Sequence, residues 1–438
     1  GAKTRPRHEL RLMNTVALPL TTAEALNQGC YCRTLSAEKL QRQLEKDDSL
    51  AGMAQDIART RPHLFSSTVV FLAQPVVEKM RLDVQALERV MALPAYQTQA
   101  LARAPAIAQH EFGPLGMFMG YAFHLGAQGP RLIEVNTNAG GALLNAALAR
   151  AQQSCCEAMN WAFKPDPTLA GLEHVFFDMF ASEWRRQRGE TPMGSVAIVD
   201  DDPAAQYLAP EFELCRHMLK QRGVDAQILA PEALKWSGGQ LSSGGEVIDM
   251  VYNRLTDFYL TDPAHSALKS AYEAGVVVMS PHPRAHALHA EKRNLVALSD
   301  ATLLSSWGVS EADQALLAAV VPQTVQVTPE RAEELWAQRR QWFFKPESGY
   351  GGKAVYRGDK LTRRVWQDII AGGFVAQAMV PPGERLIEVD GVHTDLKFDI
   401  RAYTYAGHVQ LLAARMYIGQ TTNFRTNGGG FAPAVIVP

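Results

Sequence analysis

Cysteine is scarce in this sequence, and its pattern argues against two classes of structure. The 438 residues include five cysteines, an odd number with no spacing typical of a zinc site. A protein held together by a disulfide framework would need a denser set. We therefore expect reduced and mostly buried thiols, at Cys30, Cys32, Cys155, Cys156 and Cys215.

The sequence also lacks a strong net charge and a long apolar run. With 43 Lys and Arg against 45 Asp and Glu, the net charge is −2, which offers no basic surface for nucleic acid. No apolar run approaches the roughly 18 residues that a membrane-spanning helix requires, and the amino terminus shows no apolar signal segment. We expect a cytoplasmic protein without a nucleic-acid or membrane partner, in which a local cluster of donors must hold any anionic ligand.

The chain is too long for one ordinary core, and the pattern of its elements changes twice. From about residue 190, short apolar runs at 194–199, 226–229 and 276–279 alternate with helical stretches, which predicts a parallel, doubly wound sheet. We assign residues 1–189 to an amino-terminal segment, 190–285 to a doubly wound substrate lobe and 286–438 to a third region.

The run from Arg131 to Asn136 has the apolar content of a strand but carries two polar oxygens. In regular alternation, Glu134 and Asn136 share one face while Ile133 and Val135 point into a core. A carboxylate beside an amide oxygen suits Mg²⁺, which is usually completed by phosphates and water. The alternative is an ordinary solvated face of an antiparallel strand.

The carboxyl-terminal part of the sequence predicts an antiparallel hairpin with one charged face. Apolar Leu396, Phe398, Ile400 and Ala402 alternate with polar Lys397, Asp399, Arg401 and Tyr403. After Ala406 and Gly407 a second strand is expected over residues 411–417. A polar face that carries both charge signs is typical of a cleft.

A glycine-rich loop between two expected strands completes the set of motifs. Lys345 precedes Gly349, Gly351 and Gly352, and glycines leave backbone N–H groups free to wrap an anion. The loop is neither a Walker A motif nor a dinucleotide fingerprint, and a plain β-hairpin with a flexible tip is the alternative. Farther on, the apolar segment 374–380 could offer backbone groups to an adenine edge.

Taken together, these motifs resemble the ATP-grasp superfamily. The shared features, in chain order, are Glu134-Val135-Asn136, the strand ending in Arg254, Lys292, Lys345-Pro346 with the glycine lid, Val375-Ala376-Gln377, Asp399-Ile400-Arg401, Arg415 and the loop 420–430. The metal pair normally comes last in that superfamily and comes first here. The sequence is therefore similar to circularly permuted members, namely eukaryotic-type glutathione synthetase and, more distantly, glutathionylspermidine synthetase, over residues 111–145 and 194–432.

The resemblance implies an α/β (α+β) fold, an ATP-grasp fold with circular permutation plus a doubly wound, pre-ATP-grasp-like substrate lobe. The implied activity is an ATP-dependent carboxylate–amine ligase, which forms an amide or peptide bond through an acyl phosphate and releases ADP and phosphate. Its cofactors would be ATP and Mg²⁺. Its partners would be a small-molecule or peptide carboxylate and an amine acceptor, and the resemblance is compatible with a homodimer.

The resemblance also assigns roles to individual residues. ATP would be held by Lys292, Lys345 and Glu347, by the lid residues Gly349, Gly351 and Gly352, by the hinge residues Gln377, Ala378 and Val380, and by Glu384 at the ribose. Mg²⁺ would be held by Glu134 and Asn136 with Glu347 or Asp399, and catalysis would use Arg401, Arg415 and Asp399. Asp399 is either a metal ligand or the partner that orients Arg401. Substrate would meet Arg254, Asn138, Asn423, Arg425, Thr426 and Gly429.

One position departs from the superfamily pattern. Many members carry an aspartate metal ligand about a dozen residues before the glutamate of the pair, and Ala122 stands there in this sequence. Glu347 or Asp399 could replace that ligand. The alternatives to a ligase are therefore a catalytically impaired nucleotide-binding regulator or scaffold, and an ATP-grasp phosphotransferase.

Overall fold

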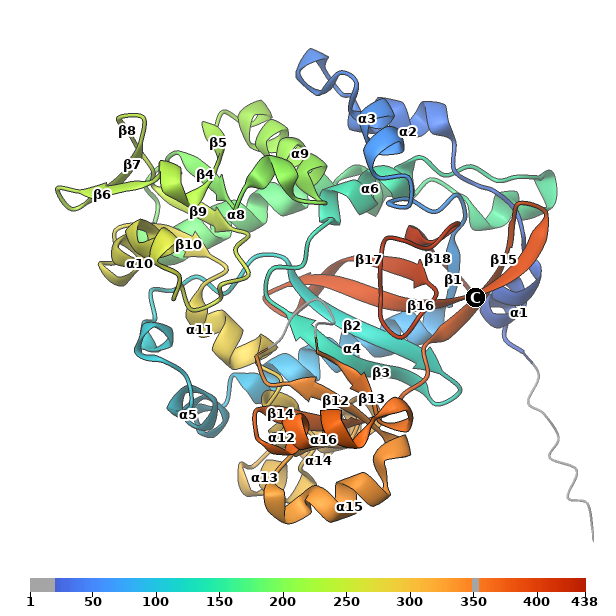
Figure 1. The fold of residues 1–438 in the computed structure, drawn as a ribbon. Helices are drawn as coiled ribbons and strands as arrows, with labels where there is room; N and C mark the ends of the chain where they lie inside the picture. Colours follow the sequence, from blue (N-terminus) through green and yellow to red (C-terminus); the bar gives the residue numbers. More distant parts are fainter. Residues whose placement is uncertain (1–19, 349–353) are drawn as a thin grey trace, which may run out of the picture.

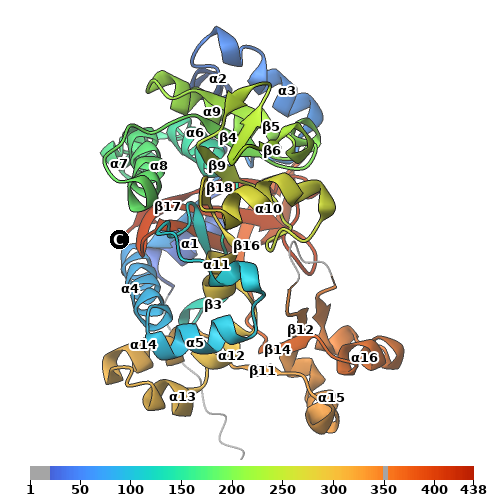
Figure 2. The same ribbon diagram turned by 90° about the vertical axis from the view of Figure 1, so that its left-hand side faces the viewer.

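The computed structural model describes residues 20–348 and 354–438. Three sheet-based regions follow one another in space: a four-stranded parallel sheet, a central seven-stranded sheet and a four-stranded antiparallel sheet (Figure 1). Figure 2 shows the same order from top to bottom after a turn of 90°.

The central sheet joins strands from opposite ends of the chain. Its order is β1-β18-β17-β16-β2-β3, with β15 paired to β16. Among the described strands of this sheet, only the β1–β18 pair is parallel. The strands are β1 (Val70–Ala73), β2 (Met119–Gly126), β3 (Gly129–Asn136), β15 (Gly383–Val389), β16 (Val392–Tyr405), β17 (His408–Tyr417) and β18 (Gly430–Val437). Because β16 pairs with β2, the early hairpin of β2 and β3, which carries Glu134, lies beside the late hairpin.

One face of the central sheet is apolar and packs on helices. Leu396, Phe398, Ile400 and Ala402 are all buried there, in one cluster with residues of α4 (Gln74–Met91) and α14 (Glu311–Val320). The predicted hairpin is confirmed, with β17 beginning at His408. Its polar series is left on the opposite face, because successive side chains of a strand alternate sides.

The parallel sheet has the doubly wound character that the sequence predicts. Its order is β10-β9-β4-β5, and all three pairings are parallel. The strands are β4 (Val196–Val199), β5 (Ala226–Leu229), β9 (Met250–Asn253) and β10 (Val278–Ser280), accompanied by α8 (Leu172–Arg188), α9 (Ala209–Gln221) and α10 (Ser266–Glu273). A small antiparallel sheet of β6 (Lys235–Ser237), β7 (Gln240–Ser243) and β8 (Glu246–Val247) is appended. The domain boundaries at residues 189 and 285 stay a prediction.

The antiparallel sheet forms the remaining region. Its order is β11-β14-β12-β13, and Phe344 packs edge-on against Trp366 in a small core of its own. The elements are β11 (Thr324–Gln326), β12 (Trp342–Pro346), β13 (Tyr356–Arg357), β14 (Phe374–Ala378), α15 (Ala332–Ala337) and α16 (Arg363–Ile370).

The other α-helices are α1 (Thr22–Gly29), α2 (Ala37–Leu44), α3 (Met53–Thr60), α5 (Pro94–Ala102), α6 (Ala142–Arg150), α7 (Pro167–Ala170), α11 (Pro283–Ala285), α12 (Asn294–Leu298) and α13 (Ala301–Ser306). None of the helices in the described residues is long and apolar enough to cross a membrane.

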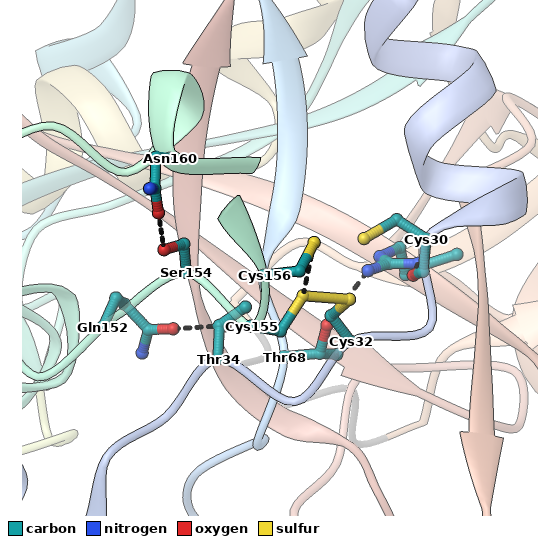
Figure 3. Close-up of a disulfide and its surroundings, with 10 residues drawn as sticks. Cys30, Cys32, Thr34, Thr68, Gln152, Ser154, Cys155, Cys156 and Asn160 are labelled. Atoms are coloured by element: carbon teal, nitrogen blue, oxygen red, sulfur yellow. Dashed lines mark hydrogen bonds between the residues drawn. A yellow bond between two sulfur atoms is a disulfide. The ribbon is translucent and has the colours of Figure 1, made fainter. Parts of the chain in front are cut away.

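The expectation that all thiols are reduced is wrong, because Cys32 and Cys155 form a disulfide (Figure 3). A β-bridge between Leu35 and Gln152 brings the two segments together across 123 positions of sequence. Cysteine spacing alone cannot reveal such a pairing. Of the three free cysteines, Cys215 is buried, Cys30 is half-buried and Cys156 is exposed, so the expectation of mostly buried thiols also fails.

Candidate functional site

A cleft lies between the polar face of the central sheet and the antiparallel sheet. Its walls include residues of β2, β3, β16 and β17 on one side and of β12 and β14 on the other. The lining residues are His124, Ile133, Glu134, Lys292, Phe343, Lys345, Pro346, Val355, Gln377, Ala378, Val380, Asp399, Tyr417, Gln420, Thr421 and Thr422. Many of the residues assigned to ATP and Mg²⁺ from the sequence are therefore brought together.

Strand register explains how the charged side chains of the cleft converge. Arg401 of β16 stands opposite Ala122 of β2, and Ala122 stands opposite Glu134 of β3. On the other side, Asp399 is opposite Arg415 of β17. Directly opposed residues share one face of a sheet. One polar face thus carries two carboxylates and two guanidinium groups from three different strands.

The expectation that Ile133 points into the core is wrong. The pairing of β2 with β3 shifts between Ala122 and Phe123, so that Phe123 faces Leu132 and Ile133 is an extra, bulged residue. Leu132 and Val135 are buried in the core, whereas Ile133 lines the cleft. The backbone oxygen of Ile133 accepts a 3.0 Å hydrogen bond from Nε2 of Gln377. This bond joins the two walls of the cleft.

Glu134 and Asn136 point the same way, as predicted, and Asn136 Nδ2 donates to Glu134 Oε1 at 3.2 Å. Lys292 Nζ lies 3.8 Å from Glu134 Oε2. Burial would raise the pKa of Glu134, but Lys292, Lys345, the Asn136 bond and Arg401 outweigh it and lower that pKa to about 2. The carboxylate is therefore ionised at neutral pH, which is the form that binds a hard cation.

Lys345 reaches into the cleft from β12 and is buried. Its Nζ donates a 2.7 Å hydrogen bond to Oε1 of Gln377 on β14. Burial, helped by nearby Lys292 and opposed by Glu134, lowers the pKa of Lys345 to about 8. Lys345 still carries its positive charge near neutral pH, where it can contact an anion.

A small pocket with room for about one water molecule adjoins the cleft and shares Asp399 with it. It is lined by Ala122, Asp399, Arg401, Tyr403, Ala413, Ala414, Arg415 and Phe431. Burial raises the pKa of Asp399 to about 6 against the opposing effect of Arg415 and Arg401. Burial and the neighbouring Arg401 lower the pKa of Arg415. The pocket offers donors that suit a carboxylate or phosphate oxygen.

His124 belongs to the cleft although the sequence reasoning missed it. It lies on β2, two residues after Ala122, and its Nδ1 is 2.9 Å from the backbone oxygen of Val380. Burial lowers the pKa of His124 to about 4, despite the bond to Val380. Because His124 follows Ala122 by two residues in the same strand, it lies on the same face of the sheet as the residue opposite Glu134. This spacing is the only sequence signal that could have pointed to His124.

Several predicted nucleotide and metal residues lie elsewhere. Glu347 is engaged by a 2.5 Å hydrogen bond from Gln326 Nε2, and Arg293 Nε lies 3.6 Å from its other oxygen. Glu384 is exposed on β15 and does not line the cleft. The lid residues Gly349, Gly351 and Gly352 lie outside the described residues. Within the described ranges, no group of three His, Cys, Asp or Glu side chains converges on one point that could hold a metal ion.

The predicted substrate residues fall into two groups. Arg254 is buried at the end of β9, and its Nη1 donates to the backbone oxygen of Asn138 at 2.6 Å. Asn423 accepts from Thr426 Oγ1 at 2.8 Å and shapes the loop after β17, where Gly429 avoids a clash with the backbone oxygen of Met416. Arg425 is exposed. Arg254 and Asn138 thus form one group, at the segment that follows Glu134. Asn423, Thr426 and Gly429 form the other group, in the loop whose residues Gln420, Thr421 and Thr422 line the cleft.

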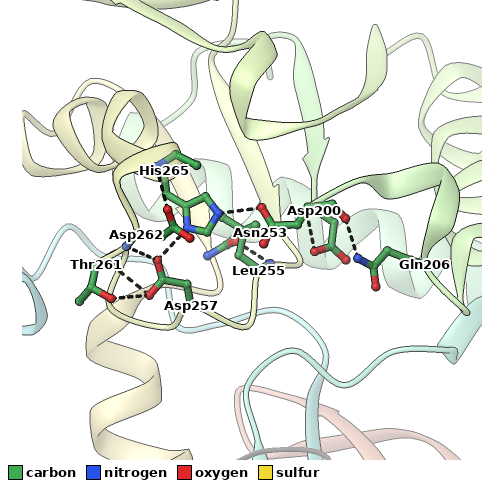
Figure 4. A network of polar contacts seen from close by, with 10 residues as sticks. Asp200, Gln206, Asn253, Leu255, Asp257, Thr261, Asp262 and His265 are labelled. Atoms are coloured by element: carbon green, nitrogen blue, oxygen red, sulfur yellow. Dashed lines mark hydrogen bonds and ion pairs between the residues drawn. The ribbon is translucent and has the colours of Figure 1, made fainter.

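A buried histidine fixes the loop that follows Arg254 (Figure 4). His265 is 1% exposed, with Nδ1 2.7 Å from Asp257 Oδ2 and Nε2 2.8 Å from Asp201 Oδ1. Burial would lower the pKa of His265, but the two carboxylates outweigh it and raise that pKa. The imidazolium thus ties the segment after β4 to the segment after β9.

The same fold is found in a solved structure. A glutathione synthetase-like effector from Globodera pallida matches with a TM-score of 0.53 and 10% identity, over 92% of this chain and 98% of that one. A putative gamma-glutamylcysteine synthetase from Methylobacillus flagellatus KT matches with a TM-score of 0.44 and 9% identity over 79% and 84% of the two chains. The ATP-grasp ligase PsnB, complexed with a minimal precursor, matches with a TM-score of 0.29 and 16% identity over 52% and 78%.

No protein-family model matches the sequence, and no curated protein matches it. The likeness to the effector confirms the predicted mixed α/β fold of a glutathione synthetase-like kind. At 10% identity this likeness concerns the fold alone.

Proposed function

We propose that this protein is an ATP-dependent carboxylate–amine ligase, which forms an amide or peptide bond through an acyl phosphate and releases ADP and phosphate. The observation that carries the proposal is one cleft in which Glu134, Lys292, Lys345 and Asp399 converge, adjoined by the pocket of Arg401 and Arg415. Transfer of a phosphoryl group places negative charge on oxygens, and cations with N–H donors stabilise that charge.

In this proposal, the residues of the cleft and those of the adjoining pocket bind different parts of the reactants. Lys292 and Lys345 bind ATP phosphates in the larger cleft, and the hinge residues 377–380 bind the base. Arg401 and Arg415 bind the substrate carboxylate and hold it toward the phosphates, while Asp399 lies between the two cavities. The glycine lid, the role of Glu384 at the ribose and the substrate contacts of Arg425 stay predictions.

The donor set of the cleft fits Mg²⁺. Glu134 is an ionised carboxylate beside the Asn136 amide, and oxygen donors of this kind hold Mg²⁺ together with substrate phosphates. Bound Mg²⁺ would neutralise charge on the phosphate oxygens. Asp399 faces the cleft and is better placed than Glu347 as a further ligand, because Glu347 is occupied by Gln326 and Arg293.

The sheet order supports a circular permutation of the ATP-grasp chain. Strands β2 and β3 come early in the sequence but complete the sheet of the late strands β16 and β17. The three regions at 1–189, 190–285 and 286–438 and a homodimeric assembly are further parts of the proposal, whereas the Cys32–Cys155 disulfide does not favour the cytoplasmic location that the sequence predicts, because disulfides are rare in that compartment. The amine and carboxylate substrates are small molecules or peptides.

A second candidate is a nucleotide-binding protein without turnover. Ala122, rather than a carboxylate, stands opposite both Glu134 and Arg401, so the polar face lacks an acidic group at its centre. Ala122→Asp distinguishes the candidates. A gain of Mg²⁺-dependent turnover from an inert parent supports the second candidate, whereas a parent that already turns over supports the ligase.

The test of the ligase is ADP release in the presence of mixed carboxylate and amine pools. Hydroxylamine traps an acyl phosphate as a hydroxamate, so hydroxamate formation that depends on ATP supports the ligase. Tight ATP binding without ADP release in any pool would sink the ligase and leave the nucleotide-binding alternative.

A further inference from the structure

We propose that His124 contacts the nucleoside in the cleft, and that its Nε2 atom accepts a hydrogen bond from the adenosine part of ATP. The inference rests on the proposed function, because it requires the cleft to bind ATP. It concerns a residue of β2 that none of the motifs includes.

The bond to Val380 fixes which nitrogen of the imidazole carries the proton. Nδ1 lies 2.9 Å from the backbone oxygen of Val380, and a carbonyl oxygen can only accept. Nδ1 must therefore donate, which leaves Nε2 of the neutral ring as an acceptor. Across the described parts of the chain, Nε2 has no hydrogen-bond partner.

The surroundings keep the ring neutral. Burial lowers the pKa of His124 to about 4, and the nearby charges of Lys345 and Lys397 act in the same direction. The opposing effects of the Val380 bond and of Glu134 are smaller than that of burial. At neutral pH the ring is an acceptor rather than a second cation beside Lys345.

The position of His124 directs this acceptor toward a nucleoside. His124 and Val380 line the same cleft as Lys345, and the segment that ends at Val380 is the proposed base-binding hinge. The lysines of the cleft can only donate hydrogen bonds. Adenine presents the exocyclic amine as a donor where guanine carries an acceptor oxygen, while the ribose hydroxyl groups are donors common to both nucleosides. A bond from the exocyclic amine favours adenosine over guanosine, whereas a bond from a ribose hydroxyl group favours neither.

Two substitutions test the contributions of the two ring nitrogens to ATP binding separately. His124→Asn keeps an amide donor where Nδ1 bonds Val380 but lacks any atom at the place of Nε2. His124→Gln carries an amide oxygen about as far from the backbone as Nε2. Calorimetric titration with ATP and Mg²⁺ at pH 7.5 should show roughly three- to tenfold weaker binding by the Asn variant, the range for one net hydrogen bond. The Gln variant should recover part of that loss.

The donor is identified with analogues that each lack one candidate group. Purine riboside triphosphate lacks the exocyclic amine, and 2′-deoxyATP and 3′-deoxyATP each lack one hydroxyl group. Wild type and His124→Asn should bind equally well to the analogue that lacks the group bonded by Nε2. His408→Asn is the control, because His408 is exposed at the start of β17 and outside the cleft lining.

The outcomes separate this inference from the proposed function. If wild type and a folded His124→Asn variant bind ATP equally, the inference fails while ATP binding stands. If wild type does not bind ATP, both fail. Should the Asn variant not fold, as judged by circular dichroism, the analogue series with wild type decides, and equal affinity for ATP and all three analogues overturns the inference.

Discussion

Lys345 donates a 2.7 Å hydrogen bond from Nζ to Oε1 of Gln377, and Nε2 of the same amide donates to the backbone oxygen of Ile133. Gln377 therefore uses both ends of its amide. The amide oxygen positions the buried ammonium group of Lys345 in the cleft, and the amide nitrogen joins the antiparallel sheet to the central sheet.

Replacing Gln377 by Met should weaken both the fold and the nucleotide site. Met has a similar size but leaves Lys345 and the Ile133 oxygen without this partner, which costs roughly 1–3 kcal/mol when such groups are buried. We expect a lower free energy of unfolding in urea and weaker ATP binding in calorimetry. Gln338→Met, at an exposed position of the same region, is the control. An unchanged urea midpoint would show that the amide anchors neither group.

Glu134→Ala should abolish Mg²⁺-dependent turnover without unfolding the protein. The substitution removes the ionised carboxylate from the cleft, and loss of such an electrostatic contact costs on the order of 100-fold in turnover. ADP release is the measurement, with Glu388→Ala, at an exposed position of β15, as control. Because the pKa of Glu134 is about 2, Mg²⁺ binding through this group should be independent of pH above about 4. Undiminished turnover of the Ala variant would remove Glu134 from the site.

Asp399→Asn should stabilise the protein at neutral pH. The folded pKa of Asp399, about 6, lies above the unfolded value of about 3.9. The folded state therefore holds the proton more tightly, and its stability falls as pH rises from about 4 through 6. The Asn variant does not lose this stability, so its advantage over wild type should be roughly 3 kcal/mol at pH 7.5 and about 0.5 kcal/mol at pH 4. Urea unfolding at both pH values measures it, with Asp395→Asn as control; a variant less stable than wild type at pH 7.5 contradicts the prediction.

His265 predicts the opposite pH dependence. Its folded pKa is raised by Asp201 and Asp257, so the stabilisation is complete below the unfolded pKa of about 6.5 and is lost as pH rises through the folded pKa. His265→Asn should lower the free energy of unfolding by roughly 1–3 kcal/mol at pH 6 and by less at pH 9. Thermal unfolding across that range checks it, and an equal loss at both pH values would assign His265 a packing role instead.

The disulfide predicts how many thiol groups react in the denatured protein before and after reduction. Denatured wild type should show three reactive thiols before reduction and five after it, because Cys32 and Cys155 are joined. Cys32→Ser should lower stability by up to about 4–5 kcal/mol, since the bond closes a loop of more than 100 residues. Cys156→Ser, at an exposed free cysteine, should not. Five thiols before reduction would favour a reducing compartment such as the cytoplasm.

Alternation and register made much of the site predictable from the sequence. The hairpin of residues 392–417 and the parallel sheet follow from periodicity, and Glu134 and Asn136 lie on the expected face. What could not be predicted depends on contacts between distant segments. The Cys32–Cys155 pair, the bond from His124 to Val380 and the engagement of Glu347 by Arg293 each join residues whose proximity only the folded chain decides.

Because Ile133 is a bulged residue, the geometry of this site depends on the number of residues in β3 as well as on their chemical character. If Ile133 were deleted, Leu132, Glu134, Val135 and Asn136 would alternate regularly, so that the core and the polar pair would both keep their direction. Only the peptide oxygen that receives Gln377 would disappear, and with it the anchor of Lys345. A single-residue insertion, which leaves composition and polarity almost unchanged, thus governs how firmly the two walls of the cleft hold each other.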